Sequence, residues 1–255
     1  MSEVVILGRD SLSTKLLFFR LSKAGYDVGW HEERRDNRLD LLKRRIKKFG
    51  LFFVCSQLTF QVYQKLLYKL SMSRVEQIVG DFNSLKYIAP IKVSSNINDA
   101  DLSYISDRRI DLVILSGTRI LSSETLDSLG SVPIINIHAG ITPKYRGVHG
   151  GYWALANGDW ENFGATLHFV DTGVDTGGVI AHVRLVPKET DNFATYPLLQ
   201  QESAIDVLLN VIPDILHGTV DCGVTSNTDK DSSSRIWTHP TVFQYIGNYL
   251  RYRVK

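Results

Sequence analysis

The sequence contains little cysteine and no large excess of charge of either sign. Two cysteines, Cys55 and Cys222, stand in a chain of 255 residues, and they form neither a CxxC pair nor a zinc-ligand spacing. Lysine and arginine number 29 against 27 aspartate and glutamate, so the net charge is only +2. These shortages argue against a disulfide scaffold and against a dedicated nucleic-acid binder, which usually carries a strong basic excess.

Several common catalytic and cofactor motifs are also missing. The turn after the first apolar segment begins with Gly8 but continues as neither a dinucleotide-binding GxGxxG fingerprint nor a P-loop. The sequence has no GxSxG turn, and its seven histidines form no HExxH motif or compact metal cluster. We therefore expect no bound metal and no serine nucleophile of the α/β-hydrolase type.

The overall composition is that of a soluble globular protein. Apolar residues make up 44% and charged residues 22% of the chain, close to the usual averages. The opening residues, MSEVVILG, lack the pattern of a secretory signal peptide. Together with the scarce cysteines, these features predict a cytoplasmic protein without stable membrane insertion.

Short apolar segments that alternate with helical patterns predict the fold. Val4–Gly8 resembles a strand buried on both faces, and Ser11 or Ser13 provides an N-cap for a helix that ends near Gly25. Such a succession is typical of an α/β fold with a Rossmann-like, mostly parallel sheet and helices on both faces. We expect further strands at residues 26–30, 112–117, 133–138, 164–170 and 178–186, and a helix at residues 195–217.

The predicted elements divide the chain into two parts. We expect residues 1–190 to form a catalytic domain with a helical insert at about residues 31–75. Residues 191–255 are expected to form a helix and tail packed on that domain, with a polar loop at residues 223–234. The aromatic residues of the tail make it a candidate contact surface for a second copy of the chain.

The insert joins a charged segment to an apolar one. Residues 31–50 hold eight basic and four acidic side chains, and Leu51–Leu70 is strongly apolar. Gln57, Gln61 and Gln64 fall on one stripe of a helix, which predicts an amphipathic helix packed on the body. The alternative is a basic, amphipathic element that touches a membrane surface or a partner. We favour the first interpretation, because this periodicity is commonest in ordinary surface helices.

Polar residues gather where two of the predicted strands end. Asn136 and His138 lie two residues apart, so they face the same side at the carboxyl end of an apolar strand, where α/β sheets bind ligands. An amide donor and an imidazole at this place suit the oxyanion and the proton of acyl transfer. The loop from Asp171 to Gly178 adds Asp175, a second carboxylate that can orient the imidazole. Taken alone, these residues leave purely structural roles open, because Asp- and Gly-rich loops are usually turns.

Longer motifs around these residues carry a family resemblance. Asn136-x-His138, PKYRG at Pro143–Gly147, ANGD at Ala156–Asp159 and GATLHFVDTGVDTGG at Gly164–Gly178 occur in the order seen in folate-dependent formyltransferases, and the chain resembles that family. The family includes glycinamide ribonucleotide, methionyl-tRNA and sugar-nucleotide formyltransferases. LVILSGTRIL at Leu112–Leu121 is a weaker match. The resemblance, clear over about residues 98–190, implies the formyltransferase fold with a small C-terminal extension.

The resemblance also implies a mechanism. The primary amine of an acceptor attacks the formyl carbon of 10-formyltetrahydrofolate directly, through a tetrahedral intermediate. In this mechanism Asn136 and protonated His138 stabilise the oxyanion. Asp175 keeps His138 charged and helps to pass a proton from the amine to the folate nitrogen. The folate is expected against Gly117, Thr118, Arg119, Ile120 and Leu121 on one side and Val170 and Asp171 on the other.

The family resemblance also narrows the chemical class of the acceptor. HAGITPKYRG, GGYWAL and RIWTHPT are more similar to the sugar-nucleotide formyltransferases of surface polysaccharide pathways, so we expect a nucleotide-linked amino sugar. Lys144 and Arg146 would then meet phosphates or the folate glutamate, or else belong to a solvated loop. Trp153 is expected either at the acceptor side of the cleft or in the core.

Other functions remain open at this stage. The acceptor amine could instead belong to an aminoacyl group of a peptide synthetase, hydroxyornithine or glycinamide ribonucleotide. A formyltetrahydrofolate hydrolase and a non-catalytic folate-binding protein rank lower, the latter because Asn136, His138 and Asp175 are all present. About 65 residues follow the matched block and are not strongly basic, which argues against a tRNA acceptor.

Overall fold

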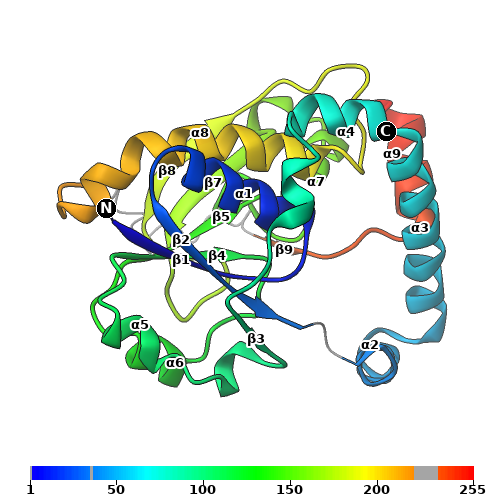
Figure 1. Cartoon of the computed structure of the whole chain (residues 1–255). Coiled ribbons are helices and arrows are strands. Elements are labelled where there is room, and N and C mark those ends of the chain that lie inside the picture. The colour runs from blue at the N-terminus through cyan, green and yellow to red at the C-terminus, as the bar shows by residue number, and fades with distance from the viewer. Residues whose placement is uncertain (1, 35–36, 221–234) are drawn as a thin grey trace.

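The structure is a computed structural model that describes residues 2–34, 37–220 and 235–255 (Figure 1). The described residues form a seven-stranded sheet in the order β3-β2-β1-β4-β5-β7-β8. Its first five strands are parallel, and β7 and β8 continue it as antiparallel neighbours. The predicted α/β fold is confirmed. The strands are β1 (Glu3–Gly8), β2 (Asp27–Glu33), β3 (Lys92–Ser94), β4 (Leu112–Ser116), β5 (Ile134–His138), β7 (Gly164–Phe169) and β8 (Val179–Arg184).

Some predicted features cannot be compared with this structure. The expected loop at residues 223–234, Cys222 and two charged residues of the insert, Arg35 and Asp36, lie outside the described residues.

Alternation of side chains along the strands builds an apolar layer on each face of the sheet. Val4 and Ile6 of β1 belong to the layer under α1, α4 and α8, and Val5 and Leu7 to the layer over α5 and α6 (Figure 1). Ser11 caps α1 as predicted, accepting a hydrogen bond from the N–H of Thr14 at 3.2 Å. The helices are α1 (Leu12–Lys23), α4 (Met72–Val79), α5 (Ser103–Asp107), α6 (Ser123–Ser128) and α8 (Tyr196–Leu216).

Helix α8 lies within the predicted C-terminal part but shares the core of the sheet. Its buried residues Leu198, Ile205 and Leu208 pack in the same cluster as β1 and β4. Pro197 stands in its first turn, where a missing N–H costs nothing. The sheet and α8 therefore fold around one apolar layer.

The strand pairing brings the polar motifs together at one edge. Gly8 of β1 is in register with Ser116 of β4, so these parallel strands end side by side. Strand β7 runs antiparallel to β5 and sets Asn136 opposite His168. Residues that follow β1, β4 and β5 therefore meet side chains of β7 at the carboxyl edge of the sheet.

A second group of elements stands beside this sheet. Strand β6 (Tyr145–Gly147) pairs with β9 (Arg235–Trp237), and an aromatic cluster including Phe60, Tyr152 and Tyr245 joins the neighbouring helices. These helices are α2 (Arg38–Phe49), α3 (Leu51–Leu70), α7 (Gly150–Ala156) and α9 (Val242–Tyr252), and short 3-10 turns lie at Ser84–Tyr87, Ile97–Asp99 and Trp160–Asn162.

Helix α3 spans the predicted range, but the polar stripe that we expected to face solvent is partly buried. Gln57 is only 2% exposed, while Leu51, Phe52, Val62, Leu66 and Leu70 face solvent. The Gln57 amide is hydrogen-bonded to Arg45 and to the main-chain carbonyl of His239, which satisfies its polar atoms inside the protein. Helix α3 does pack on the body, through Val54 and Phe60, so the prediction is wrong only for the side that carries Gln57.

None of the described helices has the length and apolar character required to cross a lipid bilayer.

Candidate active site

A cleft of about 350 Å³ opens at the carboxyl ends of β1, β4 and β5. Its volume falls within the range of roughly 300–1,000 Å³ that is usual for small-molecule sites. The structure places in its lining every residue that the sequence predicted for catalysis or for folate binding, namely Asn136, His138, Asp175, Gly117, Thr118, Arg119, Ile120, Leu121, Val170 and Asp171.

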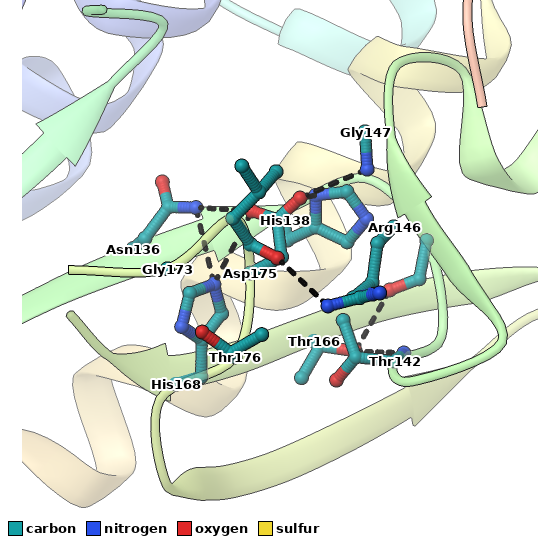
Figure 2. A network of polar contacts seen from close by, with 12 residues as sticks. Asn136, His138, Thr142, Arg146, Gly147, Thr166, His168, Gly173, Asp175 and Thr176 are labelled. Carbon is teal, nitrogen blue, oxygen red and sulfur yellow. Dashed lines mark hydrogen bonds and ion pairs between the residues drawn. The ribbon is translucent and has the colours of Figure 1, made fainter. Parts of the chain in front are cut away.

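Asp175 is the residue that the other polar groups of the cleft contact (Figure 2). Its Oδ2 accepts a hydrogen bond from the N–H of Gly147 at 2.9 Å and lies 3.3 Å from Nδ1 of His138. Its Oδ1 accepts a long hydrogen bond, 3.5 Å, from Nδ2 of Asn136. The carboxylate thus connects the end of β5 with the loop after β7 and with β6.

The backbone at Asp175 is in the left-handed region, with φ at +51°. This conformation is uncommon outside glycine, although aspartate tolerates it better than most residues. The same loop requires Gly177, because a Cβ there would lie 1.8 Å from the main-chain oxygen of Phe169. The local sequence Asp-Thr-Gly-Gly therefore suits a tight turn that directs the carboxylate into the cleft.

His138 is held between two acceptors. Its Nδ1 faces Asp175, and its Nε2 donates to the main-chain oxygen of Tyr145 at 2.7 Å. Burial lowers the pKa of His138, although the Asp175 carboxylate and the Tyr145 carbonyl act in the opposite direction. Burial therefore favours the neutral ring in the free site, and the charged ring that the resemblance implies stays a prediction.

For the Asp175 carboxylate, the contacts outweigh burial in setting the pKa. Burial by itself raises the pKa of Asp175, but contacts with His168 and His138 and the N–H of Gly147 outweigh it and hold the pKa below its usual value. Asp175 is therefore ionised at neutral pH. A neutral imidazole in this place can take up a proton. The protonated ring has an N–H on each nitrogen, and Asp175 and the Tyr145 oxygen can accept one each.

The position of the imidazole also depends on Gly140. A Cβ at this residue would lie 2.4 Å from the Tyr145 oxygen and 2.8 Å from Nε2 of His138. Any side chain there would displace one of the two groups. The glycine of His-Ala-Gly therefore lets the loop pass close beneath the imidazole.

His168 is a site residue that the sequence reasoning missed. Its Nε2 lies 3.2 Å from Nδ2 of Asn136, and its Nδ1 donates to the oxygen of Phe169 at 2.7 Å. Nε2 of His168 thus lies between the Asn136 amide and the Asp175 carboxylate, whose Oδ1 is 3.7 Å away. The signal was available: His168 is part of the matched GATLHFV motif, in a strand of alternating side chains.

A buried carboxylate and two arginines form the other missed feature. Glu33, whose side chain is fully buried, accepts hydrogen bonds from the N–H groups of Arg119 at 2.9 Å and Ile97 at 3.0 Å. The Arg119 guanidinium is ion-paired with Glu33, and Nε of Arg9 lies 3.7 Å from Oε2 of the same carboxylate. Both arginines line the cleft, so its β1 side is positively charged. Only the pairing of β1, β2 and β4 reveals this group.

The three residues expected at the acceptor lie beside the cleft. Nζ of Lys144 is 2.6 Å from Oδ2 of Asp159, and Nη1 of Arg146 is 3.5 Å from the oxygen of Val174. Trp153 is 7% exposed, donates through Nε1 to the oxygen of Thr238 at 3.0 Å and is in the aromatic core. None of the three is among the described residues that line the cleft. Of the two places expected for Trp153, the structure shows the one in the core.

Comparison with known families gives a match over much of this region. The family described as formyl transferase matches residues 64–211, more than half of the chain. The match includes β4, β5, β7 and the loop after β7, and therefore Asn136, His138, His168 and Asp175. The family suggested by the sequence motifs is confirmed.

Two curated relatives are about 30% identical to the chain over the aligned residues. A methionyl-tRNA formyltransferase from Azobacteroides pseudotrichonymphae is 31% identical over 176 residues, which are 67% of this chain and 53% of that protein. One from Agathobacter rectalis is 29% identical over 170 residues, 63% of this chain and 53% of that protein. The chain thus matches about half the length of these relatives.

Solved structures of low sequence identity share the fold. An N-formyltransferase from Helicobacter canadensis, in complex with folinic acid and dTDP-3-aminofucose, has a TM-score of 0.56 at 17% identity, covering 93% of this chain and 71% of that one. Glycinamide ribonucleotide transformylase 1 from Symbiobacterium toebii has a TM-score of 0.54 at 17% identity, covering 86% and 89%. These structures support the architecture described above.

Proposed function

The chain belongs to the formyl transferase family, and from this premise we propose that it transfers a formyl group from 10-formyltetrahydrofolate to the primary amine of a nucleotide-linked amino sugar. One observation carries the proposal. Asn136, His138 and Asp175 line the same cleft as residues Gly117–Leu121. Catalytic groups and a binding surface for a flat ring are thus within one site.

The cleft suits the folate in shape and chemistry. Leu115, Leu121 and Val170 line it with apolar side chains, which suit the faces of a pterin ring. Residues Gly117–Leu121 line the same cleft, and their main-chain groups can bind the ring's polar edge. When bound, 10-formyltetrahydrofolate supplies the one-carbon group and the nitrogen from which that group departs.

His138 and Asp175 handle the proton in this proposal. As the amine forms its bond to the formyl carbon, the proton that it loses passes by way of the Asp175 carboxylate to Nδ1 of the neutral imidazole. The resulting cation is stabilised by Asp175 and by the Tyr145 oxygen, which already contact the ring. When the bond from the formyl carbon to the folate nitrogen breaks, that nitrogen receives the proton.

Asn136 stabilises the charge that develops on the formyl oxygen. Its Nδ2 lies 3.2 Å from Nε2 of His168 and makes only a long hydrogen bond, 3.5 Å, to Asp175, so the second N–H can turn from the carboxylate to the oxyanion. Removal of one such donor typically costs about 10²–10³ in kcat. Asn136 and the His138 cation act in the same direction. The amide N–H dipole and the charged ring both stabilise negative charge on the formyl oxygen.

The positively charged side of the cleft supports a phosphorylated acceptor. Arg9 and Arg119 line it, and Nε of Arg9 has no hydrogen-bond partner among the described residues. A guanidinium in this position can bind a diphosphate, as nucleotide-linked sugars carry. The structure of similar fold from Helicobacter canadensis holds such a nucleotide sugar, dTDP-3-aminofucose.

Charged initiator tRNA is the second candidate acceptor. It is favoured by the name of the curated relatives, which are methionyl-tRNA formyltransferases. The balanced charge of this chain, +2, favours a small acceptor instead, since tRNA binding depends on a strong basic surface.

A mass-spectrometric screen of acceptors tests the proposal. The protein and 10-formyltetrahydrofolate are incubated with nucleotide-linked amino sugars, glycinamide ribonucleotide, hydroxyornithine and charged tRNA. We expect a formyl mass gain on an amino sugar, absent with His138→Ala. Gain only on another amine would overturn the substrate and keep the reaction. Release of tetrahydrofolate without any acceptor would indicate a hydrolase.

A further inference from the structure

An apolar face covers the outer side of α3 and α9. We define this outer face as Leu51, Phe52, Val62, Leu66 and Leu70 of α3 with Phe243, Ile246 and Leu250 of α9. Each of these side chains is between 48% and 76% exposed. Exposed apolar residues that gather on neighbouring helices usually mark an interaction surface, whereas single ones are common on any protein.

The outer face is contiguous across the two helices. The rings of Phe52 and Phe243 are stacked, with centroids 5.9 Å apart, and so join the stripe of α3 to that of α9. A groove of about 640 Å³ between the helices is lined by Tyr63, Leu67 and Ile246 among others. Figure 1 shows α3 and α9 together at one side of the molecule, away from the main sheet.

Basic residues flank this face at both ends of α3. Helix α2, which leads into α3, carries Lys43, Arg44, Lys47 and Lys48 on exposed positions and has one acidic residue, Asp40. Near the other end of α3, Lys65 and Lys69 are exposed. The chain as a whole has a net charge of only +2, so this basic excess is local.

We propose that the outer face docks on the surface of an anionic phospholipid bilayer. Apolar side chains would enter the boundary between headgroups and acyl chains, while lysines and arginines contact the anionic headgroups. Helix α3 would lie in the plane of the membrane without crossing it, in agreement with the absence of a spanning helix among the described residues. The proposal is independent of the reaction at the cleft.

The charge distribution favours a bilayer over a second copy of the chain. A two-fold pair would bring the same face of each copy together. Because both ends of α3 are flanked by basic side chains, parallel and antiparallel pairing alike would place positive charge against positive charge. An anionic bilayer is instead complementary both to the apolar face, through its acyl chains, and to the basic residues that flank it, through its headgroups.

Vesicle flotation of the full chain tests this proposal. We expect the protein to float with vesicles of phosphatidylcholine and phosphatidylglycerol, but not with pure phosphatidylcholine. Salt at 0.5 M should weaken binding, since the basic residues act by screened electrostatics. Flotation that does not depend on anionic lipid, or no flotation with either vesicle, would overturn the proposal.

Matched variants assign the effect to the face. Val62→Gln/Leu66→Gln should weaken binding on the order of tenfold or more, because two apolar side chains no longer enter the membrane. Lys43→Gln/Lys47→Gln/Lys48→Gln should weaken it on the order of a hundredfold. Tyr87→Gln/Val186→Gln, at positions 87% and 89% exposed elsewhere, is the control and should bind as the wild type does.

The second copy is excluded or revealed by sedimentation velocity of the same proteins. A monomer that binds anionic vesicles supports the proposal. A dimer that dissociates in Val62→Gln/Leu66→Gln, with no vesicle binding by the wild type, would overturn it. Circular dichroism and formyl transfer should be unchanged in all variants, because none of the substituted residues lines the described cleft.

Discussion

Single residues decide the chemistry of the cleft, and Asp175 is the one with the most contacts. Replacement by asparagine keeps its size and its tolerance for a positive φ, so the fold should survive. The charge beside His138 is lost, and the imidazole can no longer form a stabilised cation. We expect kcat to fall on the order of a hundredfold.

A neighbouring carboxylate provides the control for this variant. Asp171 lies in the same loop, where it accepts hydrogen bonds from the N–H of Gly173 and the hydroxyl of Thr176. Asp171→Asn should leave kcat within about tenfold, because Asp171 has no contact with His138; a change in the KM for the folate is expected instead, since Asp171 lines the cleft. Equal kcat values for wild type and Asp175→Asn would show that proton transfer does not depend on this carboxylate.

Buried histidines outside the cleft make stability depend on pH. Nε2 of His149 and Nε2 of His239 are 3.1 Å apart. Burial, together with the other imidazole, lowers the pKa of His149 to about 3; burial and Arg45 lower that of His239 to about 4. Between these values and about 6.5 the unfolded chain binds more protons, so acidification must destabilise the folded protein.

The pH dependence can be measured with one substitution. His239→Gln removes one titrating group while keeping a hydrogen-bonding side chain. Between pH 7 and pH 5 the wild type should lose about 2 kcal/mol more free energy of unfolding than this variant. Urea denaturation at both pH values measures the difference. His217→Gln, which removes an exposed imidazole, should behave as the wild type, and an equal loss in His239→Gln would contradict the account.

Elements are positioned by their buried sides, and α3 shows this most clearly. Phe60 is fully buried against Phe193 and Tyr245, with ring centroids 4.8 and 4.7 Å away. Phe60→Ala should lower the free energy of unfolding by about 3–5 kcal/mol. Val62→Gln/Leu66→Gln, on the outer face, should change it by about 0.5 kcal/mol or less per site.

Urea denaturation of both variants checks the orientation of the helix. A loss of several kcal/mol in the outer-face variant would mean that these side chains are packed against other parts of the chain. An unchanged Phe60→Ala would mean that α3 contributes little to the aromatic core.

Strand and helix patterns predicted the sheet well because burial on both faces leaves a strong signal in sequence. Val4–Gly8 and the strand ending at His138 were predicted within a residue or two. The same reasoning failed for the orientation of α3, because period alone does not reveal which stripe is buried. Gln57 is buried since Arg45 and the His239 carbonyl happen to reach it, and both come from other elements.

The sequence predicted those residues of the candidate site that belong to recognisable motifs. Asn136, His138 and Asp175 belong to segments whose order carries the family resemblance. Arg9 and Glu33 are ordinary charged residues in sequence, and they meet Arg119 only because β1, β2 and β4 are neighbours. Tertiary pairing of this kind has no local pattern.

At the scale of the whole molecule, the cleft and the outer face occupy different parts of the chain. The cleft is formed by the carboxyl edge of the main sheet, whereas the outer face belongs to α3 and α9. Changes on the outer face should therefore alter location without altering turnover, and changes at Asp175 should do the opposite.

The central claim is formyl transfer at the Asn136, His138 and Asp175 cleft, and one labelling experiment tests it most directly. The donor carries carbon-13 in its formyl group, and NMR follows the label in the presence of the amino-sugar acceptor. We predict that the label appears as a formamide on the acceptor with the wild type and not with Asp175→Asn. Label that appears as free formate, or that remains on the folate, would contradict the account.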